Sequence, residues 1–124
     1  MSYDINLVDA VTGDVLQLDE PHHMRGGTYA AGGTSEASLN VTYNYAEHFE
    51  RVLPTNTISN EVGIRSIYGM TGVQSLRVLS AAILLLGDDA DPDYWKPTEG
   101  NAKRALIQLV ILASMRLDGV WKGD

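Results

Sequence analysis

Cysteine is absent from the chain, which excludes disulfide bonds and thiolate metal sites. Long apolar runs are absent too: a transmembrane helix needs about 20 apolar residues, and the longest runs, 81–86 and 109–113, are far shorter. The first residues show no basic segment followed by an apolar one, so no signal peptide is expected. These absences favour a cytoplasmic protein that does not associate with a membrane.

Basic residues are scarce. The 124 residues include 9 Lys and Arg against 16 Asp and Glu, and the net charge is −7. Bulk DNA or RNA is not an expected partner, because proteins bind it through a basic surface that releases counterions from the phosphates. A small anionic ligand is compatible with this charge, since one or two well-placed cations are enough to bind it. The length indicates a single domain over residues 1–124, with 44% hydrophobic residues to form its core.

The N-terminal half is expected to contain most of the β-structure. Alternating apolar and polar residues over 3–18 predict a β-hairpin with Gly13 in its turn. Residues 39–43 alternate in the same way and favour a third strand, whereas 44–53 has helical spacing and stops before Pro54.

Two long helices are expected after residue 70. Thr71 and Gln74 match a capping box, and Thr98 is the expected N-cap of the second helix. Gly87 and Gly119 are expected to end the two helices. Residues at helical spacing are predicted to face inward: Val73, Leu76, Leu79, Ala82, Ile83 and Leu86 in the first helix, and Ala102, Ala105, Leu106, Leu109, Val110 and Ala113 in the second.

Further apolar residues widen both inward stripes, namely Leu84, Leu85, Ile107, Ile111 and Leu112. A homo-oligomer with two-fold symmetry would cover this extra apolar surface. Residues 64–68 are compatible with either a short strand or a helical turn. The patterns predict an α+β fold, in which an N-terminal β-hairpin and a small antiparallel sheet pack on about three helices, including two long C-terminal ones.

The first candidate site is a glycine-rich stretch in the first third of the chain. Arg25 is the only Lys or Arg among the first fifty residues, which carry eight Asp and Glu. Beside Gly26 and Gly27, its planar guanidinium can bind a phosphate or carboxylate while backbone N–H groups approach the same anion. The neighbouring side chains that can add hydrogen bonds are His22, His23, Thr28 and Tyr29. The alternative is that Arg25 pairs with Asp19 or Glu20 while the glycines turn the chain.

The second candidate site is the expected start of the last helix. This segment comprises residues 95–104. Thr98 and Asn101 can hydrogen-bond an anion where free N–H groups and the helix dipole attract it, and Lys103 or Arg104 would add positive charge. Arg65 would suit a phosphate beside a stacked ring. The alternatives are an ordinary capped helix with solvated basic residues, and tyrosines that belong to the core. The tyrosines that can stack on a base are Tyr29, Tyr43 and Tyr68.

No metal, cofactor or catalytic residue is expected. The adjacent His22 and His23 point to opposite faces of an extended chain, so they rarely bind one ion together. The acidic run 88–93 resembles a calcium loop, but Tyr94 stands where that loop needs glycine. No serine lies in a nucleophile elbow, so an enzyme is the less favoured interpretation.

Four segments resemble a family of small proteins in phages and prophages of Gram-positive bacteria: residues 21–29, 40–45, 63–69 and 98–106. This family has no established activity, so no functional residue follows from the resemblance. It implies a phage-type accessory protein in the cytoplasm of an infected bacterial host. Some small phage proteins are oligomers that bind nucleotide signals of host defence without cleaving them.

The expected function is therefore the binding and sequestration of a small phosphate-bearing nucleotide by a homo-oligomer. Two alternatives stay open. One is an inhibitor that blocks a host defence system by protein contact, as anti-CRISPR proteins do. The other is a small phosphate-ester enzyme that depends on His22 or His23.

Overall fold

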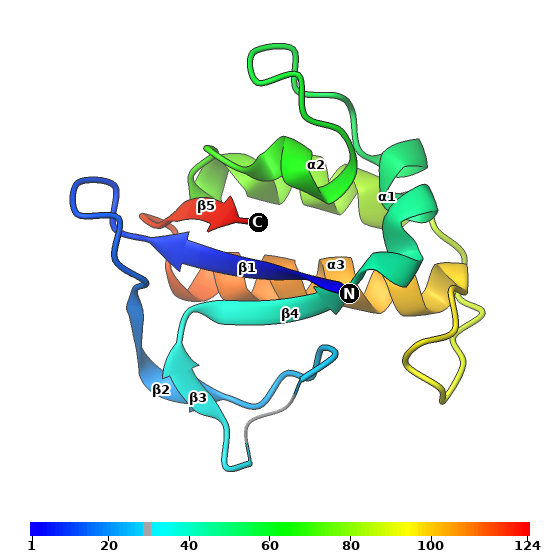
Figure 1. Cartoon of the computed structure of the whole chain (residues 1–124), viewed down its shortest axis with the longest axis horizontal. Helices are drawn as coiled ribbons and strands as arrows, with labels where there is room; N and C mark the ends of the chain where they lie inside the picture. Colours follow the sequence, from blue (N-terminus) through cyan, green and yellow to red (C-terminus); the bar gives the residue numbers. More distant parts are fainter. Residues whose placement is uncertain (29–30) are drawn as a thin grey trace.

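Three antiparallel strands form the main sheet, in the order β4–β1–β5 (Figure 1). The central strand is β1 (Ser2–Val8), and its neighbours are β4 (Ser38–Thr42) and β5 (Val120–Gly123). The central strand therefore pairs with two segments that are distant from it in the sequence. The computed structural model describes residues 1–28 and 31–124.

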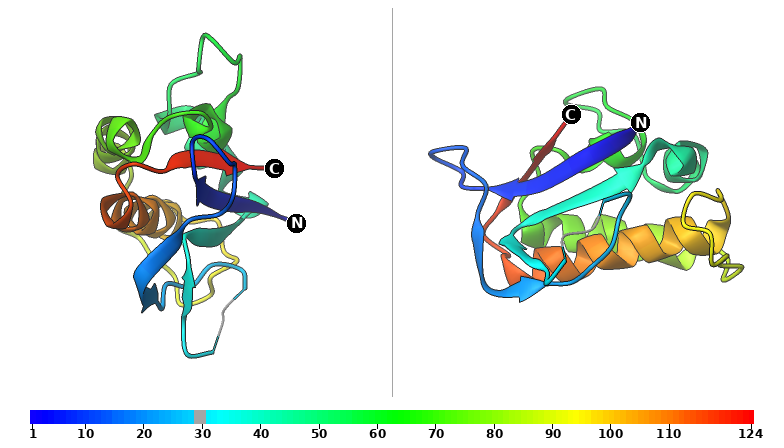
Figure 2. Two further views of the ribbon diagram at one scale, coloured as in Figure 1. Left: turned by 90° about the vertical axis from the view of Figure 1, so that its left-hand side faces the viewer. Right: turned by 60° about the horizontal axis from the view of Figure 1, so that its bottom comes forward.

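Alternate residues of β1 face opposite sides of the sheet. One side is polar and includes Asp4 and Asn6, which line a cavity there. The other side is covered by α2 (Gly72–Leu84) and α3 (Glu99–Met115), which pack against each other and against the sheet (Figure 2). The β1 residues buried in this core are Tyr3, Ile5 and Leu7.

A second, smaller sheet consists of β2 (Gln17–His22) and β3 (Thr34–Glu36), which are antiparallel. The turn after β1 brings Val15 opposite Val8 in a single bridge. Beyond this bridge β2 leaves β1 and pairs with β3, because β4 and β5 occupy the two edges of β1. The N-terminal strands and the antiparallel sheet structure predicted from the sequence are present, whereas the hairpin predicted over residues 3–18 is reduced to this single bridge.

The helical segments follow the predicted order. The helix predicted after the third strand consists of η1 (Tyr43–Tyr45), a short 3-10 helix, and α1 (Ala46–Val52). The segment that was compatible with a strand or a helical turn is a 3-10 helix, η2 (Gly63–Ile67). Both long helices begin after the predicted N-caps, Thr71 and Thr98.

Both long helices end earlier in the sequence than predicted. Helix α2 ends at Leu84, before Gly87, and α3 ends at Met115, before Gly119. Gly119 has a different reason to be glycine: a Cβ there would lie 2.9 Å from the Leu7 side chain of β1. It therefore lets the chain pass close to the sheet just before β5.

One residue of α2 that was predicted to face inward, Val73, does not do so. The side of the helix that carries Val73 is open, and Val73 is 57% exposed. The polar Ser75 is buried in its place because its hydroxyl accepts a hydrogen bond of 2.7 Å from the Trp121 indole N–H. Trp121 lies in β5, a strand that the sequence did not predict, and is 1% exposed.

Most of the apolar residues expected to widen the helix stripes are exposed, whereas Leu112 is buried. We refer to the exposed large apolar residues of the two helices as their exposed apolar face: Val73, Leu84, Leu85, Ile107, Ile111 and Met115. Within the described residues, no helix is long and apolar enough to cross a lipid bilayer.

Candidate functional site

The glycine-rich loop, residues 23–28, faces the first turns of α3 across a cavity of about 560 Å³. We refer to this space as the cationic cavity. Residues from three separate parts of the sequence line it: His23, Met24, Arg25, Gly26, Gly27 and Thr28 of the loop, Pro92, Tyr94 and Trp95 of the segment before α3, and Arg104 and Gln108 of α3.

The two glycines of the loop are required by close packing. A Cβ on Gly26 would overlap the backbone oxygen of Asn40 in β4. A Cβ on Gly27 would lie 2.5 Å from the Asn40 side-chain oxygen and 2.9 Å from the Trp95 ring. The predicted close approach of the backbone to another group is therefore present, and the group is the edge of β4. This packing places Arg25 at the cavity.

His22 fixes the chain that enters the loop. Its side chain is 7% exposed, and its Nε2 donates a hydrogen bond of 2.9 Å to the backbone oxygen of Ser38. Its Nδ1 accepts a hydrogen bond of 3.2 Å from the Met24 backbone N–H. Both ring nitrogens are thus engaged in joining β2 to β4, and His23 alone of the two histidines lines the cationic cavity.

The aromatic wall of the cavity, Tyr94 and Trp95, is held by hydrogen bonds from the body of the fold. The Thr42 backbone N–H donates to the Tyr94 hydroxyl at 2.9 Å, and the Tyr45 hydroxyl donates to the Tyr94 backbone oxygen. The Asn44 side chain donates to the Trp95 backbone oxygen at 2.8 Å. Burial raises the pKa of Tyr94 above its ordinary value. Trp95 is 49% exposed, which leaves part of its ring open to the cavity.

Arg104 is the cation of α3 that reaches the cavity. Its side chain is exposed, and no described residue forms an ion pair with it. Gln108 lies four residues later on the same helix face and lines the same cavity. A smaller hollow beside it is also lined by both Arg25 and Arg104. The described lining of the cationic cavity contains no carboxylate, so these guanidinium groups favour an anion.

The N-terminus of α3 is occupied by the chain itself. The Gly100 N–H donates to the Asp89 side chain at 3.2 Å, and the Asn101 N–H donates to the Thr98 hydroxyl at 3.1 Å. A Cβ on Gly100 would overlap the backbone nitrogen of Ala90. The space beside this glycine is therefore filled by the backbone of the preceding segment and is not open to a ligand. Thr98 and Asn101 consequently support the cavity wall without lining the larger space.

Asn101 is buried and connects α3 to the segment that carries the aromatic wall. Its side-chain oxygen accepts a hydrogen bond of 2.9 Å from the Asp91 N–H. Its amide donates to the backbone oxygens of Asp93, at 2.9 Å, and Lys96, at 3.0 Å. These three bonds fix the chain on both sides of Trp95.

Arg65 and its neighbouring tyrosines lie outside the cationic cavity. The Arg65 guanidinium donates to the backbone oxygen of Asp124 at 2.8 Å and to the Tyr43 hydroxyl at 3.3 Å. It also lies over the rings of Tyr3 and Tyr43, 5.1 and 5.7 Å from their centroids. Tyr68 is not among the residues that line the cavity either. Tyr29 lies outside the described residues.

Two carboxylates of the acidic run before α3 accept hydrogen bonds from backbone N–H groups of the same segment. Asp91 accepts from the Asp93 N–H at 2.8 Å, and Asp93 accepts from the Trp95 N–H at 3.1 Å. Asp88 pairs with Lys103 at 2.6 Å, and this ion pair holds the pKa of Asp88 below its usual value. Over residues 1–28 and 31–124, no three His, Asp or Glu side chains are grouped so that they could hold a metal ion.

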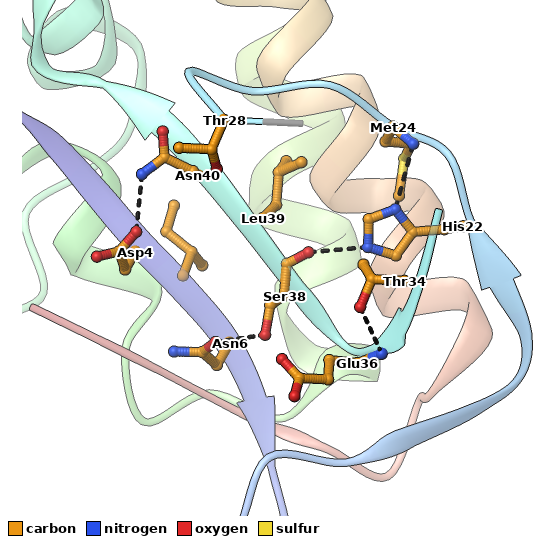
Figure 3. A pocket seen from close by; sticks show the side chains of 11 residues that line it. Asp4, Asn6, His22, Met24, Thr28, Thr34, Glu36, Ser38, Leu39 and Asn40 are labelled. Atoms are coloured by element: carbon orange, nitrogen blue, oxygen red, sulfur yellow. Dashed lines mark hydrogen bonds between the residues drawn. The ribbon is translucent and has the colours of Figure 1, made fainter. Parts of the chain in front are cut away.

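A second cavity of about 330 Å³ lies on the polar face of the main sheet (Figure 3). We refer to it as the polar cavity. It shares Met24 and Thr28 with the lining of the cationic cavity. Its other lining residues come from β1, β2, β3 and β4, and are Asp4, Ile5, Asn6, His22, Thr34, Glu36, Ser38, Leu39 and Asn40.

The structure brings together six residues that the sequence proposed for a site: His23, Arg25, Gly26, Gly27, Thr28 and Arg104. Tyr94, Trp95 and Gln108 were not among the predicted binding residues, although Trp95 begins the segment predicted as the second candidate site. The spacing of Arg104 and Gln108 on one helix face was a usable signal for Gln108. Aromatic character alone marked Tyr94 and Trp95 as residues that can line a pocket, and hydrogen bonds from distant residues place them there.

The chain was compared with known protein families, with curated proteins and with solved structures, and none of them matches it.

Proposed function

We propose that the protein binds a small phosphate-bearing nucleotide in the cationic cavity and sequesters it without cleaving it. One observation carries this proposal: Arg25 and Arg104, far apart in the sequence, line one cavity beside the half-exposed ring of Trp95. Guanidinium groups bind phosphate oxygens in a planar, two-pronged arrangement, and an exposed indole stacks on a base.

The size and charge of the cavity support this ligand class. Its volume of about 560 Å³ falls within the ~300–1,000 Å³ that is usual for small-molecule sites. The chain as a whole carries a net charge of −7, so a cavity with two arginines and no carboxylate in its described lining contrasts with its surroundings. An anion is therefore directed to this position.

The hydrogen bonds of His22 argue against a phosphate-ester enzyme that depends on His22, whereas His23 lines the cationic cavity. A phosphate-ester enzyme of the type considered from the sequence needs an imidazole free to transfer a proton. His22 uses both ring nitrogens in hydrogen bonds to the backbone, and Thr98 and Asn101 are engaged in holding the start of α3. We further propose a phage-type accessory protein that acts as a homo-oligomer in the cytoplasm of an infected host, as the sequence resemblance implies.

The test is calorimetry with a panel of mono-, di- and cyclic nucleotides, combined with Trp95 fluorescence. Because a hydrogen bond to a charged group contributes about 1.5–3 kcal/mol, Arg104→Gln and Arg25→Gln should each weaken binding roughly 10- to 100-fold. Arg77→Gln is the matched control, since Arg77 is an exposed arginine of α2 that lines none of the described cavities. Mass spectrometry should recover the nucleotide intact.

Binding would be attributed to another place if Arg104→Gln and Arg77→Gln behaved alike. No binding across the panel would remove the proposal, and a cleaved nucleotide would replace sequestration by catalysis. In each variant, circular dichroism checks that the fold is retained.

A second candidate function, inhibition of a host protein by contact, is favoured by the exposed apolar face of α2 and α3. Leu84 is 84% exposed there, and Ile107 and Ile111 lie on the neighbouring helix. A host-protection assay separates the two candidates. Arg104→Gln should abolish protection of the phage if the protein captures a nucleotide, whereas Leu84→Glu should abolish it if the protein acts by contact.

A further inference from the structure

Two cavities of opposite character meet at the glycine-rich loop. The cationic cavity contains Arg25 and Arg104, whereas the described lining of the polar cavity contains two carboxylates and no Lys or Arg. Met24 and Thr28 belong to both linings, so the two cavities lie next to each other. Thr28 is exposed, and a ligand that extends over its side chain would contact both cavities.

The carboxylates of the polar cavity are available to a ligand. Glu36 is exposed on β3, and its carboxylate makes no hydrogen bond or ion pair with any described residue. Asp4 accepts a hydrogen bond of 2.7 Å from the Asn40 amide through Oδ1. Asp4 is exposed, and its second oxygen forms no hydrogen bond or ion pair with a described residue. Figure 3 shows the Asp4 and Asn6 side chains projecting from β1 and the Glu36 side chain projecting from β3 at this cavity.

A donor accompanies these acceptors. The side-chain oxygen of Asn6 accepts a hydrogen bond of 2.6 Å from the Ser38 hydroxyl. This bond fixes which end of the amide faces Ser38 and leaves the Asn6 NH₂ group as a donor at the cavity. The polar cavity thus combines carboxylate acceptors with an amide donor: Asp4 and Asn6 lie on β1, and Glu36 lies on β3.

This combination is suited to the hydroxyl groups of a sugar. Each hydroxyl donates one hydrogen bond and accepts others, so neighbouring hydroxyls satisfy a carboxylate and an amide together. A phosphate would be repelled by Asp4 and Glu36, whereas a sugar attached to a phosphate would not. Carboxylates recognise ribose hydroxyls in the same way in dinucleotide-binding folds.

We infer that the polar cavity binds the second sugar of a nucleoside diphosphate sugar whose phosphates occupy the cationic cavity. This inference rests on the proposed function, because the phosphates are bound by Arg25 and Arg104. It narrows the ligand class: the molecule continues beyond its phosphates, past Thr28, and ends in a group that carries hydroxyls.

Calorimetry with two matched ligand pairs tests the inference, ADP with ADP-ribose and UDP with UDP-glucose. In at least one pair, the compound with the second sugar should bind roughly 10-fold more tightly than the diphosphate, as expected for two or three added hydrogen bonds. Glu36→Gln and Asp4→Asn should each reduce that preference roughly 3- to 10-fold and leave the affinity for the diphosphate unchanged. Glu47→Gln, on the exposed side of α1, is the control.

The outcomes separate the inference from the proposed function. Diphosphates that bind through Arg104, with no added affinity from the second sugar in either pair, would overturn the inference and leave the proposed function intact. Loss of affinity for diphosphate and sugar compound alike in Glu36→Gln would also overturn it. If none of the four compounds bound and the wider panel failed as well, the proposed function would fall first.

Discussion

The two long helices begin in the same way in sequence but not in structure. At the start of α2, the Thr71 hydroxyl accepts from the Gln74 N–H and the Gln74 side chain accepts from the Thr71 N–H, so the cap is complete within four residues. At the start of α3, Thr98 forms the corresponding bond with Asn101, but the Asn101 side chain binds the segment before the helix. One start is a local cap, and the other is a local cap that also builds a cavity wall.

The largest expected effect concerns Asn101 and Gln74, which each lie three residues after the N-cap of their helix. Asn101→Ala removes three hydrogen bonds of a buried side chain and leaves the Asp91 N–H without its partner, so we expect a loss of about 2–4 kcal/mol in the free energy of unfolding. Gln74→Ala should cost less than about 1 kcal/mol. Urea denaturation measures both values.

Nucleotide affinity provides the second readout for this pair. Asn101→Ala should abolish binding in the cationic cavity because Trp95 loses its position, whereas Gln74→Ala should leave binding unchanged. Equal losses of stability, or unchanged binding in Asn101→Ala, would contradict the distinction between the two starts.

A smaller effect is expected at the N-caps themselves. Thr71→Ala and Thr98→Ala each remove one side-chain cap, and each should lower the free energy of unfolding by about 1 kcal/mol. Only Thr98→Ala should change the emission of Trp95 and weaken nucleotide binding. If Thr71→Ala shifted the same emission, the coupling between helix start and cavity would not be specific to α3. The emission of the buried Trp121 serves as the internal reference for the fold.

The smallest effect is expected from acid. The pKa of Asp91 is lowered from its ordinary value of 3.8, chiefly by the hydrogen bond from the Asp93 N–H. A carboxyl group whose pKa is lower in the folded state stabilises the fold above its ordinary pKa, and this contribution disappears as the pH falls further. The start of α2 uses only Thr71 and Gln74 and has no such group.

Nuclear magnetic resonance measures this difference. On titration below pH 3.8, the backbone amide of Asp93 should shift, whereas that of Gln74, which donates to the neutral Thr71 hydroxyl, should not. Replacing Asp91 with Asn should remove the shift of the Asp93 amide. A titration of Gln74 in the same range would mean that acid acts on the whole fold and not on the start of α3.

The same contrast explains how much of the fold was predictable. The capping box at Thr71, the N-cap at Thr98 and the alternation in β1 and β4 are local patterns, and the structure contains all of them. Strand β5 was not predictable in this way. It has four residues, Val120–Gly123, and it exists because it pairs with β1 and buries Trp121 against Ser75. None of these partners is near it in the sequence.

The candidate site was predictable to the same extent. Arg25 with its glycines and Arg104 were recognisable as single features, but their convergence depends on Gly26 packing against Asn40 of β4. Arg65 next to Tyr68 looked equally suitable in the sequence, yet its guanidinium binds the Asp124 backbone and the Tyr43 hydroxyl. The sequence indicated which residue types could bind a ligand, whereas long-range hydrogen bonds determine which of these residues line the same cavity.

The central place of β1 in the sheet has a consequence for folding. Both hydrogen-bonding edges of β1 are satisfied only by distant segments, β4 on one side and β5 on the other. Contacts of such high sequence separation slow folding, because the intervening chain must lose its freedom before the strands can pair. Until Val120–Gly123 docks, one edge of β1 exposes unpaired backbone groups that can template pairing with another chain. Aggregation during refolding should therefore compete with the docking of β5.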